Sequence, residues 1–180
     1  MRGARAAGSL AVLAALALLV RPELARYGAE RRLGDATNAF RMLLDRPADA
    51  ETGRNLLVVG EAALATTGAL PGDPRPWILG GSAYLVTNQP QPALDTYRDA
   101  FATGERSEID LNLGRAYAML GRRDNADRAF VRAGWVSPEI LESLPDALKQ
   151  KAAAEVQRLT RDLYAGRLTE PPPLPSDERR

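Results

Sequence analysis

The feature that most restricts the fold of this chain is a set of small and aromatic residues that recurs after 33 residues, from Gly81 to Gly114. The two copies align at five positions: Gly81 with Gly114, Tyr84 with Tyr117, Ala93 with Ala126, Tyr97 with Phe130, and Ala100 with Ala133. Self-similarity at a period of about 20–50 residues is typical of repeat proteins, whose units pack against their neighbours. The spacing therefore predicts a stack of similar units.

Each copy contains the residue types that a pair of antiparallel helices needs. A glycine on the first helix lets the second helix approach closely, and alanines on the second helix complete that contact. Tyr84 and Tyr117 are expected to fill the space three residues further along the first helix, and Tyr97 and Phe130 to cover the open end of the hairpin. Elsewhere the chain also reads as helices separated by glycine and proline, and no segment shows the sustained alternation that is typical of strands. The sequence predicts an all-α fold.

With Trp77 at the start of the earlier copy and Pro138 after the later one, these residues resemble the tetratricopeptide repeat (TPR) family, in its membrane-anchored bacterial form. The resemblance implies two TPR units, 74–106 and 107–138, in a short α-solenoid of antiparallel helical hairpins. The match has departures. The earlier unit carries Gly80 where a leucine is usual, and the later unit has Asp110 at the tryptophan position.

The segments on either side of the two units extend the helical pattern. Segment 23–67 predicts a further helical hairpin, which is a candidate degenerate repeat. Segment 139–166 predicts capping helices with a polar outer face, as terminal units of such arrays need. Their expected buried stripe consists of Leu148, Ala152, Val156, Leu159 and Leu163. The Pro-rich tail, 167–180, cannot bury enough apolar surface to fold alone, so we expect it to be extended, disordered and mobile. Its Pro171 to Pro175 stretch also suits a ligand for an aromatic groove, although a disordered end is favoured.

The amino-terminal segment, 1–22, has the pattern of a signal anchor or signal peptide. Arg2 and Arg5 precede an apolar run from Ala6 to Val20. A helix of that length spans about 22 Å, less than the roughly 30 Å of a bilayer core. The one clear cleavage match, Ala15-Leu16-Ala17, would truncate the apolar run. We therefore expect an uncleaved transmembrane anchor in the inner membrane with the repeat domain in the periplasm. The alternatives are secretion to the periplasm after cleavage, or a body that faces the cytoplasm.

The composition argues against several function classes. The chain has no cysteine and no histidine, which removes disulfides, thiolate metal sites and the usual general base near neutral pH. Lysine and arginine number 24 against 23 acidic residues, so no overall field attracts nucleic acid. We expect no catalytic residues, metal ligands or cofactors, and hence a protein that is not an enzyme. Nucleic acid is not an expected partner, and no small-molecule substrate is evident.

The TPR resemblance implies a concave groove lined by the first helix of each unit. The positions carried over are mostly apolar, with Asn112 and Arg115 as the polar contacts. The full set is Ile78, Leu79, Ser82, Leu85, Val86, Leu111, Asn112, Arg115 and Met119. This set favours an apolar peptide or amphipathic helix, since the lysines that clamp a terminal carboxylate in some family members are absent. In the alternative interpretation these residues pack against the first hairpin or the cap and fill the groove.

These patterns together predict a protein–protein interaction adaptor or scaffold of the bacterial cell envelope. The partner would be a peptide or helix of another protein, and the resemblance suggests polysaccharide secretion or pilus assembly. The second hypothesis is a self-associating structural component of the membrane that binds no peptide ligand.

Overall fold

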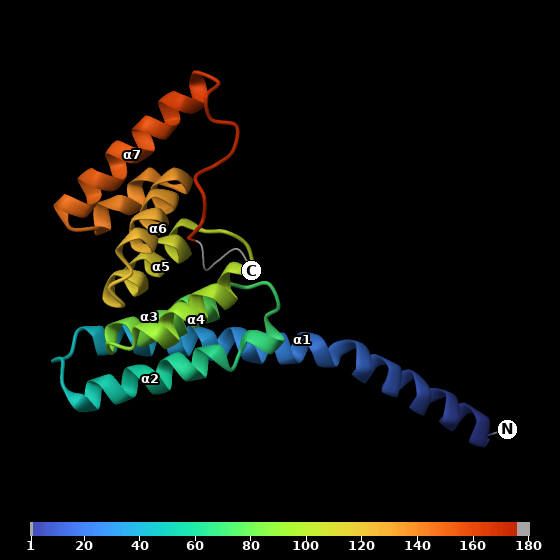
Figure 1. The fold of residues 1–180 in the computed structure, drawn as a ribbon. Helices are drawn as coiled ribbons and strands as arrows, with labels where there is room; N and C mark the ends of the chain where they lie inside the picture. Colours follow the sequence, from blue (N-terminus) through green and yellow to red (C-terminus); the bar gives the residue numbers. More distant parts are fainter. Residues whose placement is uncertain (1, 176–180) are drawn as a thin grey trace.

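The computed structural model describes the backbone of residues 2–175 and the side chains of residues 19–175. All regular secondary structure in that range is helical, with no strand (Figure 1), so the predicted all-α class is confirmed. The helices are α1 (Arg2–Leu44), α2 (Ala50–Leu64), the 3-10 helix η1 (Thr67–Ala69), α3 (Arg75–Val86), α4 (Pro90–Phe101), α5 (Ser107–Met119), α6 (Arg123–Val136), the 3-10 helix η2 (Pro138–Ser143) and α7 (Asp146–Tyr164).

Proline, aspartate and glycine set several of the helix boundaries. Proline occupies the first turn of α3, α4 and η2, where its missing N–H removes no hydrogen bond. Asp49 caps α2, because its side chain accepts a hydrogen bond of 2.7 Å from the Thr52 backbone N–H. The turn after α5 contains Gly121 at a φ of 73°, a conformation that costs glycine little. These local signals explain why the helices end where they do.

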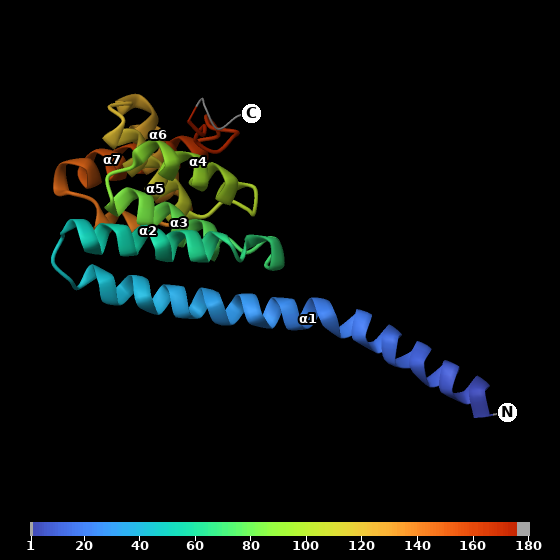
Figure 2. The ribbon, with the colours of Figure 1, turned by 90° about the horizontal axis from the view of Figure 1, so that it is seen from below.

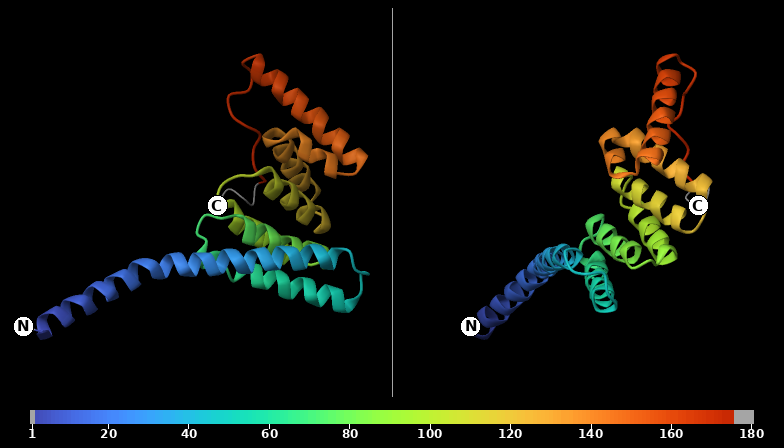
Figure 3. Two further views of the ribbon diagram at one scale, coloured as in Figure 1. Left: turned by 180° about the vertical axis from the view of Figure 1, so that it is seen from behind. Right: turned by 90° about the vertical axis from the view of Figure 1, so that its left-hand side faces the viewer.

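Consecutive helices pack against each other along the whole chain. The pairs α1–α2, α3–α4 and α5–α6 form antiparallel hairpins stacked in chain order, and α7 lies at the end of the stack opposite α1 (Figures 1 and 3). The largest core cluster is shared by α4, α5, α6, η2 and α7, and two smaller clusters join α1, α2 and α3. The hydrophobic core therefore follows the stack and has no single centre.

The recurring residues meet inside the second and third hairpins. A Cβ atom built on Gly81 would lie 2.6 Å from the ring of Tyr97, and one built on Gly114 would lie 2.4 Å from the ring of Phe130. The four alanines that recur with them are buried at 4% exposure or less: Ala93, Ala100, Ala126 and Ala133. The equivalent positions thus make equivalent contacts between the two helices of each hairpin.

Helix α1 differs from the expected boundary near Pro22. It is one continuous helix that passes through Pro22, and its N-terminal part projects away from the other helices (Figure 2). The predicted 1–22 segment forms this projecting part, although Met1 and the side chains of residues 1–18 lie outside the described residues. The predicted hairpin of 23–67 corresponds to the rest of α1 with α2 and η1. Among the described residues, no helix combines the length and apolar character needed to cross a bilayer.

The carboxyl-terminal region combines the expected cap with a packed tail. Ala152 and Leu159 of α7 are buried, whereas Leu163, expected on the same stripe, is 45% exposed. The tail after α7 is irregular and runs back toward α5 and α6 (Figure 1). Its Pro172 is buried and Pro175 is less than 2% exposed. This packing differs from the mobile tail expected for 167–180, because the tail buries Pro172 and Pro175. Residues 176–180 lie outside the described residues.

An ion-pair cluster connects α1 to the start of α3 and makes stability depend on pH. Arg75 lies 2.9 Å from Glu30 and 2.5 Å from Asp73, and its hydrogen bonds hold the pKa of Asp73 below its usual range. A carboxylate with a lowered folded-state pKa stabilises the fold above its unfolded value, about 3.9, and this contribution is lost as the pH falls through the folded pKa.

We expect Asp73→Asn to lower the free energy of unfolding at pH 7 by roughly 0.5 kcal/mol, because Arg75 is largely exposed and solvent weakens the pair. The difference between the variant and the natural chain should shrink as the pH falls from 5 toward 3. Urea denaturation followed by circular dichroism at several pH values measures it. Asp35→Asn, at an exposed position on α1, is the control. A difference that does not change with pH would contradict the assignment to the Asp73 carboxylate.

Candidate partner-binding groove and the adjacent cleft

A groove with a volume of about 440 Å³ lies where α3, α5, α6 and the start of α7 meet. Its lining is mostly apolar: Ser82, Leu85, Val86, Asn112, Arg115, Ala118, Met119, Phe130, Leu144, Pro145 and Leu148. Two of these side chains are open to solvent, since Val86 is 53% exposed and Met119 is 42% exposed. The groove therefore presents apolar surface that no other part of the described chain covers.

The structure brings together six of the nine groove residues predicted from the sequence: Ser82, Leu85, Val86, Asn112, Arg115 and Met119. The other three do not line the groove. Leu79 packs against the clusters formed with α1 and α2, and Ile78 packs against the largest core cluster. Leu111 is only 4% exposed and belongs to that core cluster. These three residues therefore pack within the fold and not in the groove.

Sequence reasoning missed the wall of the groove that comes from α6 and from the residues around the start of α7. Phe130 was expected only as a core residue, and Leu148 only on the buried stripe of the cap. Leu144 and Pro145 form the short connection between η2 and α7. The only indication of this wall in the sequence was the apolar character of the connection. No local sequence pattern specifies that the connection lies across α5. These residues close the groove at one end.

The polar groups of the groove are held by internal hydrogen bonds. Arg115 donates to Asn112 Oδ1 at 3.0 Å, and to the carbonyl oxygen and Oγ of Ser143 at 3.3 and 3.2 Å. Arg115 therefore joins α5 to η2. The hydroxyls of Ser82 and Tyr97 lie 3.0 Å apart, and burial raises the pKa of Tyr97, so its phenol stays neutral. With its polar groups engaged in this way, the groove is suited to binding an apolar surface.

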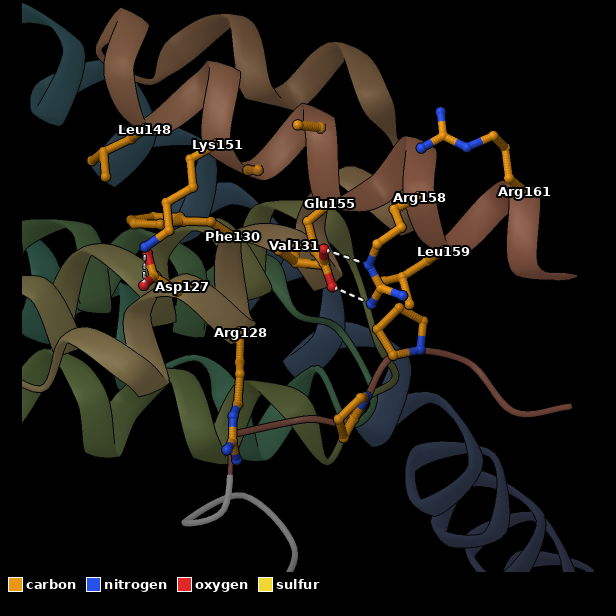
Figure 4. Close-up of a pocket in the computed structure, with 14 residues that line it drawn as sticks. Asp127, Arg128, Phe130, Val131, Leu148, Lys151, Glu155, Arg158, Leu159 and Arg161 are labelled. Carbon is orange, nitrogen blue, oxygen red and sulfur yellow. Dashed lines mark hydrogen bonds and ion pairs between the residues drawn. The ribbon is translucent and has the colours of Figure 1, made fainter. Parts of the chain in front are cut away.

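A second and larger cavity, a cleft of about 760 Å³, lies between α6 and α7 (Figure 4). Apolar residues of both helices line it, and Phe130 and Leu148 also line the groove, so the two cavities adjoin. Lys151 of α7 and Asp127 of α6 form an ion pair of 2.5 Å across the cleft. Along α7, Arg158 binds Glu155 at 2.6 Å and holds the pKa of this carboxyl below its usual range.

The carboxylates near the two cavities do not form a metal site. Among the residues that the structure describes, no three Asp or Glu side chains come together in a way that could hold a metal ion. The carboxylates of the cleft, Asp127 and Glu155, are each paired with a cation. What the arrangement offers is apolar binding surface with charged edges.

Comparison of the chain with models of known protein families, with curated proteins and with solved structures gives no match. The groove and the cleft are therefore interpreted from the geometry of this chain alone.

Proposed function

We propose that this chain is a non-catalytic adaptor or scaffold that binds a segment of another protein in the groove between α3 and α5. The observation that carries the proposal is the exposed apolar surface of Val86 and Met119, next to the half-buried side chains of Leu85 and Leu148 in the groove lining. Apolar grooves between helices are common sites for apolar peptides and amphipathic helices, which bury one face on binding.

The proposal includes a TPR-like solenoid as the finer description of the fold. It is supported by the contacts that recur after 33 residues, in which Gly81 receives Tyr97 and Gly114 receives Phe130. It is also supported by the order of the hairpins, each of which packs against the next. In such a stack, a groove formed by the first helices of successive hairpins is the expected site for a partner.

The proposal also places the protein in the bacterial cell envelope, with the N-terminal segment as a membrane anchor and the body in the periplasm. The sequence pattern of 1–22 supports it, as does the exposure of apolar side chains where α1 leaves the body: Leu19 is 73% exposed, Leu24 65% and Tyr27 70%. Cleavage of the segment and a body facing the cytoplasm remain alternatives to be tested. Polysaccharide secretion and pilus assembly are the proposed settings.

The test places a photo-crosslinking residue at Leu85, beside the groove, in the full chain within its native cells. We expect one crosslinked partner protein, whose yield falls at least tenfold when Val86→Asp and Met119→Asp are combined. A tenfold loss corresponds to about 1.4 kcal/mol of binding free energy, which a charge placed in an apolar contact readily costs. Val58→Asp is the matched control, because Val58 is 63% exposed on α2 and lies outside the groove.

The crosslinking result also distinguishes an adaptor from the second hypothesis, a self-associating structural component. A self-associating structural component would crosslink only to further copies of itself, and sedimentation of the purified chain would then show an oligomer without any partner. An unchanged yield of crosslinked partner in the Val86→Asp and Met119→Asp variant would show that the groove is not the binding site. The variants avoid Asn112 and Arg115, because Arg115 holds η2 and its loss would alter the fold as well as the groove.

A further inference from the structure

The packed tail shows a second kind of recognition, which is separate from the groove. Arg132 of α6 donates a hydrogen bond from Nη1 to the carbonyl oxygen of Pro172 at 2.5 Å, although the two residues are 40 positions apart. Pro172 is buried, and Pro175 is less than 2% exposed. A short irregular segment thus buries two of its prolines, and the carbonyl oxygen of the first accepts a charge-assisted hydrogen bond from α6.

The guanidinium of Arg132 is fixed in position by a second residue. Its Nε and Nη2 atoms both donate to the carboxylate of Glu105, which precedes α5, with the Nη2 contact at 2.7 Å. The Arg132 side chain is only 12% exposed. A bidentate pair of this kind fixes the plane of the guanidinium, so that Nη1, which does not contact Glu105, is aimed before a ligand arrives. Arg132 is therefore organised to receive a carbonyl oxygen.

The burial pattern of the tail fits a polyproline II segment. Pro172 and Pro175 are buried, while Pro171 and Pro173 are exposed and Leu174 is half-buried. A polyproline II helix has three residues per turn, so positions i and i+3 lie on one face. Its carbonyl groups have no internal partners and are free to accept hydrogen bonds. Since proline fixes φ, such a segment also loses little entropy when it docks.

The site of this contact continues into the α6–α7 cleft. Pro172 and Pro173 form part of the wall of that cleft, together with Val131 of α6 and Leu159 of α7. Figure 4 shows Leu159 and Arg158 of α7 beside the end of the cleft that the tail approaches. Among the residues that line the cleft only Pro172 and Pro173 come from the tail, so the tail accounts for a small part of this largely apolar surface.

From these contacts we infer that Arg132 and the adjoining edge of the α6–α7 cleft form a receptor for proline-rich extended segments with prolines at i and i+3, and that the chain's own tail occupies it. A proline-rich segment of a partner protein binds there only in competition with the tail. Because the tail is tethered, its effective concentration at the site is on the order of millimolar. The tail therefore blocks weak ligands and admits those that outcompete it.

The experiment uses a fluorescein-labelled peptide with the sequence of residues 168–175 and measures its binding by fluorescence anisotropy. Two full-length proteins are compared, the natural chain and the variant Pro172→Ser/Pro175→Ser, whose tail lacks the two buried rings. We expect the peptide to bind the variant at least tenfold more tightly than the natural chain, because the competing tail is released. Equal affinity for the two proteins, or no binding to either, would overturn the inference.

Substitutions on the two sides of the contact locate the site. In the tail-substituted protein, Arg132→Ala and Arg132→Lys should each weaken peptide binding at least tenfold, since neither side chain keeps the guanidinium fork. Arg123→Ala, at an exposed arginine of the same helix, is the matched control and should leave binding unchanged. A peptide with serine at the positions of Pro172 and Pro175 should not bind. Both peptides are measured on the same tail-substituted protein, so this comparison needs no further substitution in the protein, and binding of the serine peptide would also overturn the inference.

Discussion

Replacing Gly114 with valine is expected to lower the free energy of unfolding by about 3 kcal/mol, the upper part of the range for overpacked cores. A Cβ atom at this position would lie 2.4 Å from Cε1 and 2.5 Å from Cδ1 of Phe130. Phe130 is 3% exposed and its ring is packed in the largest core cluster, so the ring cannot yield without disturbing its neighbours. Helix α5 would have to move away from α6, which loosens the hairpin on which both cavities depend. Urea denaturation followed by circular dichroism measures the loss.

The matched control is Gly53→Val, because Gly53 is also inside a helix and nothing lies within 4 Å of an added Cβ there. At this site the change replaces one weak helix former with another that is somewhat better, so stability should change by less than about 1 kcal/mol. The difference between the two variants isolates the contact with Phe130. An equal loss at both positions would show that helix propensity, and not the approach of α5 to α6, determines the effect.

Much of the fold could be predicted because its determinants are local or periodic. Prolines at the first turns and Gly121 after α5 set boundaries within a few residues of those expected. The repeat in the sequence predicted the close approach of the two helices at Gly81 and Gly114, but it did not predict that the rings of Tyr97 and Phe130 lie against these glycines. The six residues that meet in the groove lie on α3 and α5, the first helices of the two recurring hairpins.

The remaining features depend on contacts between distant parts of the chain. The sequence segments 1–22 and 23–67 meet at Pro22, but α1 continues through it, since proline removes one hydrogen bond and the rest of the helix can persist. Arg132 contacts Glu105, 27 residues earlier, and Pro172, 40 residues later. No spacing rule relates such distant positions, so the sequence alone did not reveal that the tail binds at Arg132.

Tyr97→Ala is expected to lower the free energy of unfolding by about 3–5 kcal/mol, as is usual when a buried aromatic side chain is truncated. Tyr97 is fully buried in the largest core cluster, and its ring covers Gly81. Tyr97→Phe removes only the hydroxyl that lies 3.0 Å from Ser82 Oγ, so its cost should be about 1 kcal/mol. The same denaturation measurement gives both values, and similar losses for the two variants would contradict the importance of the ring.

A double-mutant cycle then tests whether the glycine and the ring act as one contact. Gly81→Ala alone should destabilise the natural chain by about 1–2 kcal/mol, because the added Cβ would lie 2.6 Å from Cζ of Tyr97. In the Tyr97→Ala background the same methyl group enters the space that the ring has left, so the clash disappears and part of the cavity is filled. The two losses should therefore fall short of additivity by at least about 1 kcal/mol. Gly53→Ala in the same background should be additive, since the surroundings of Gly53 are open. Additivity at Gly81 as well would mean that the two helices of this hairpin are held together by contacts other than the recurring pair of glycine and aromatic ring.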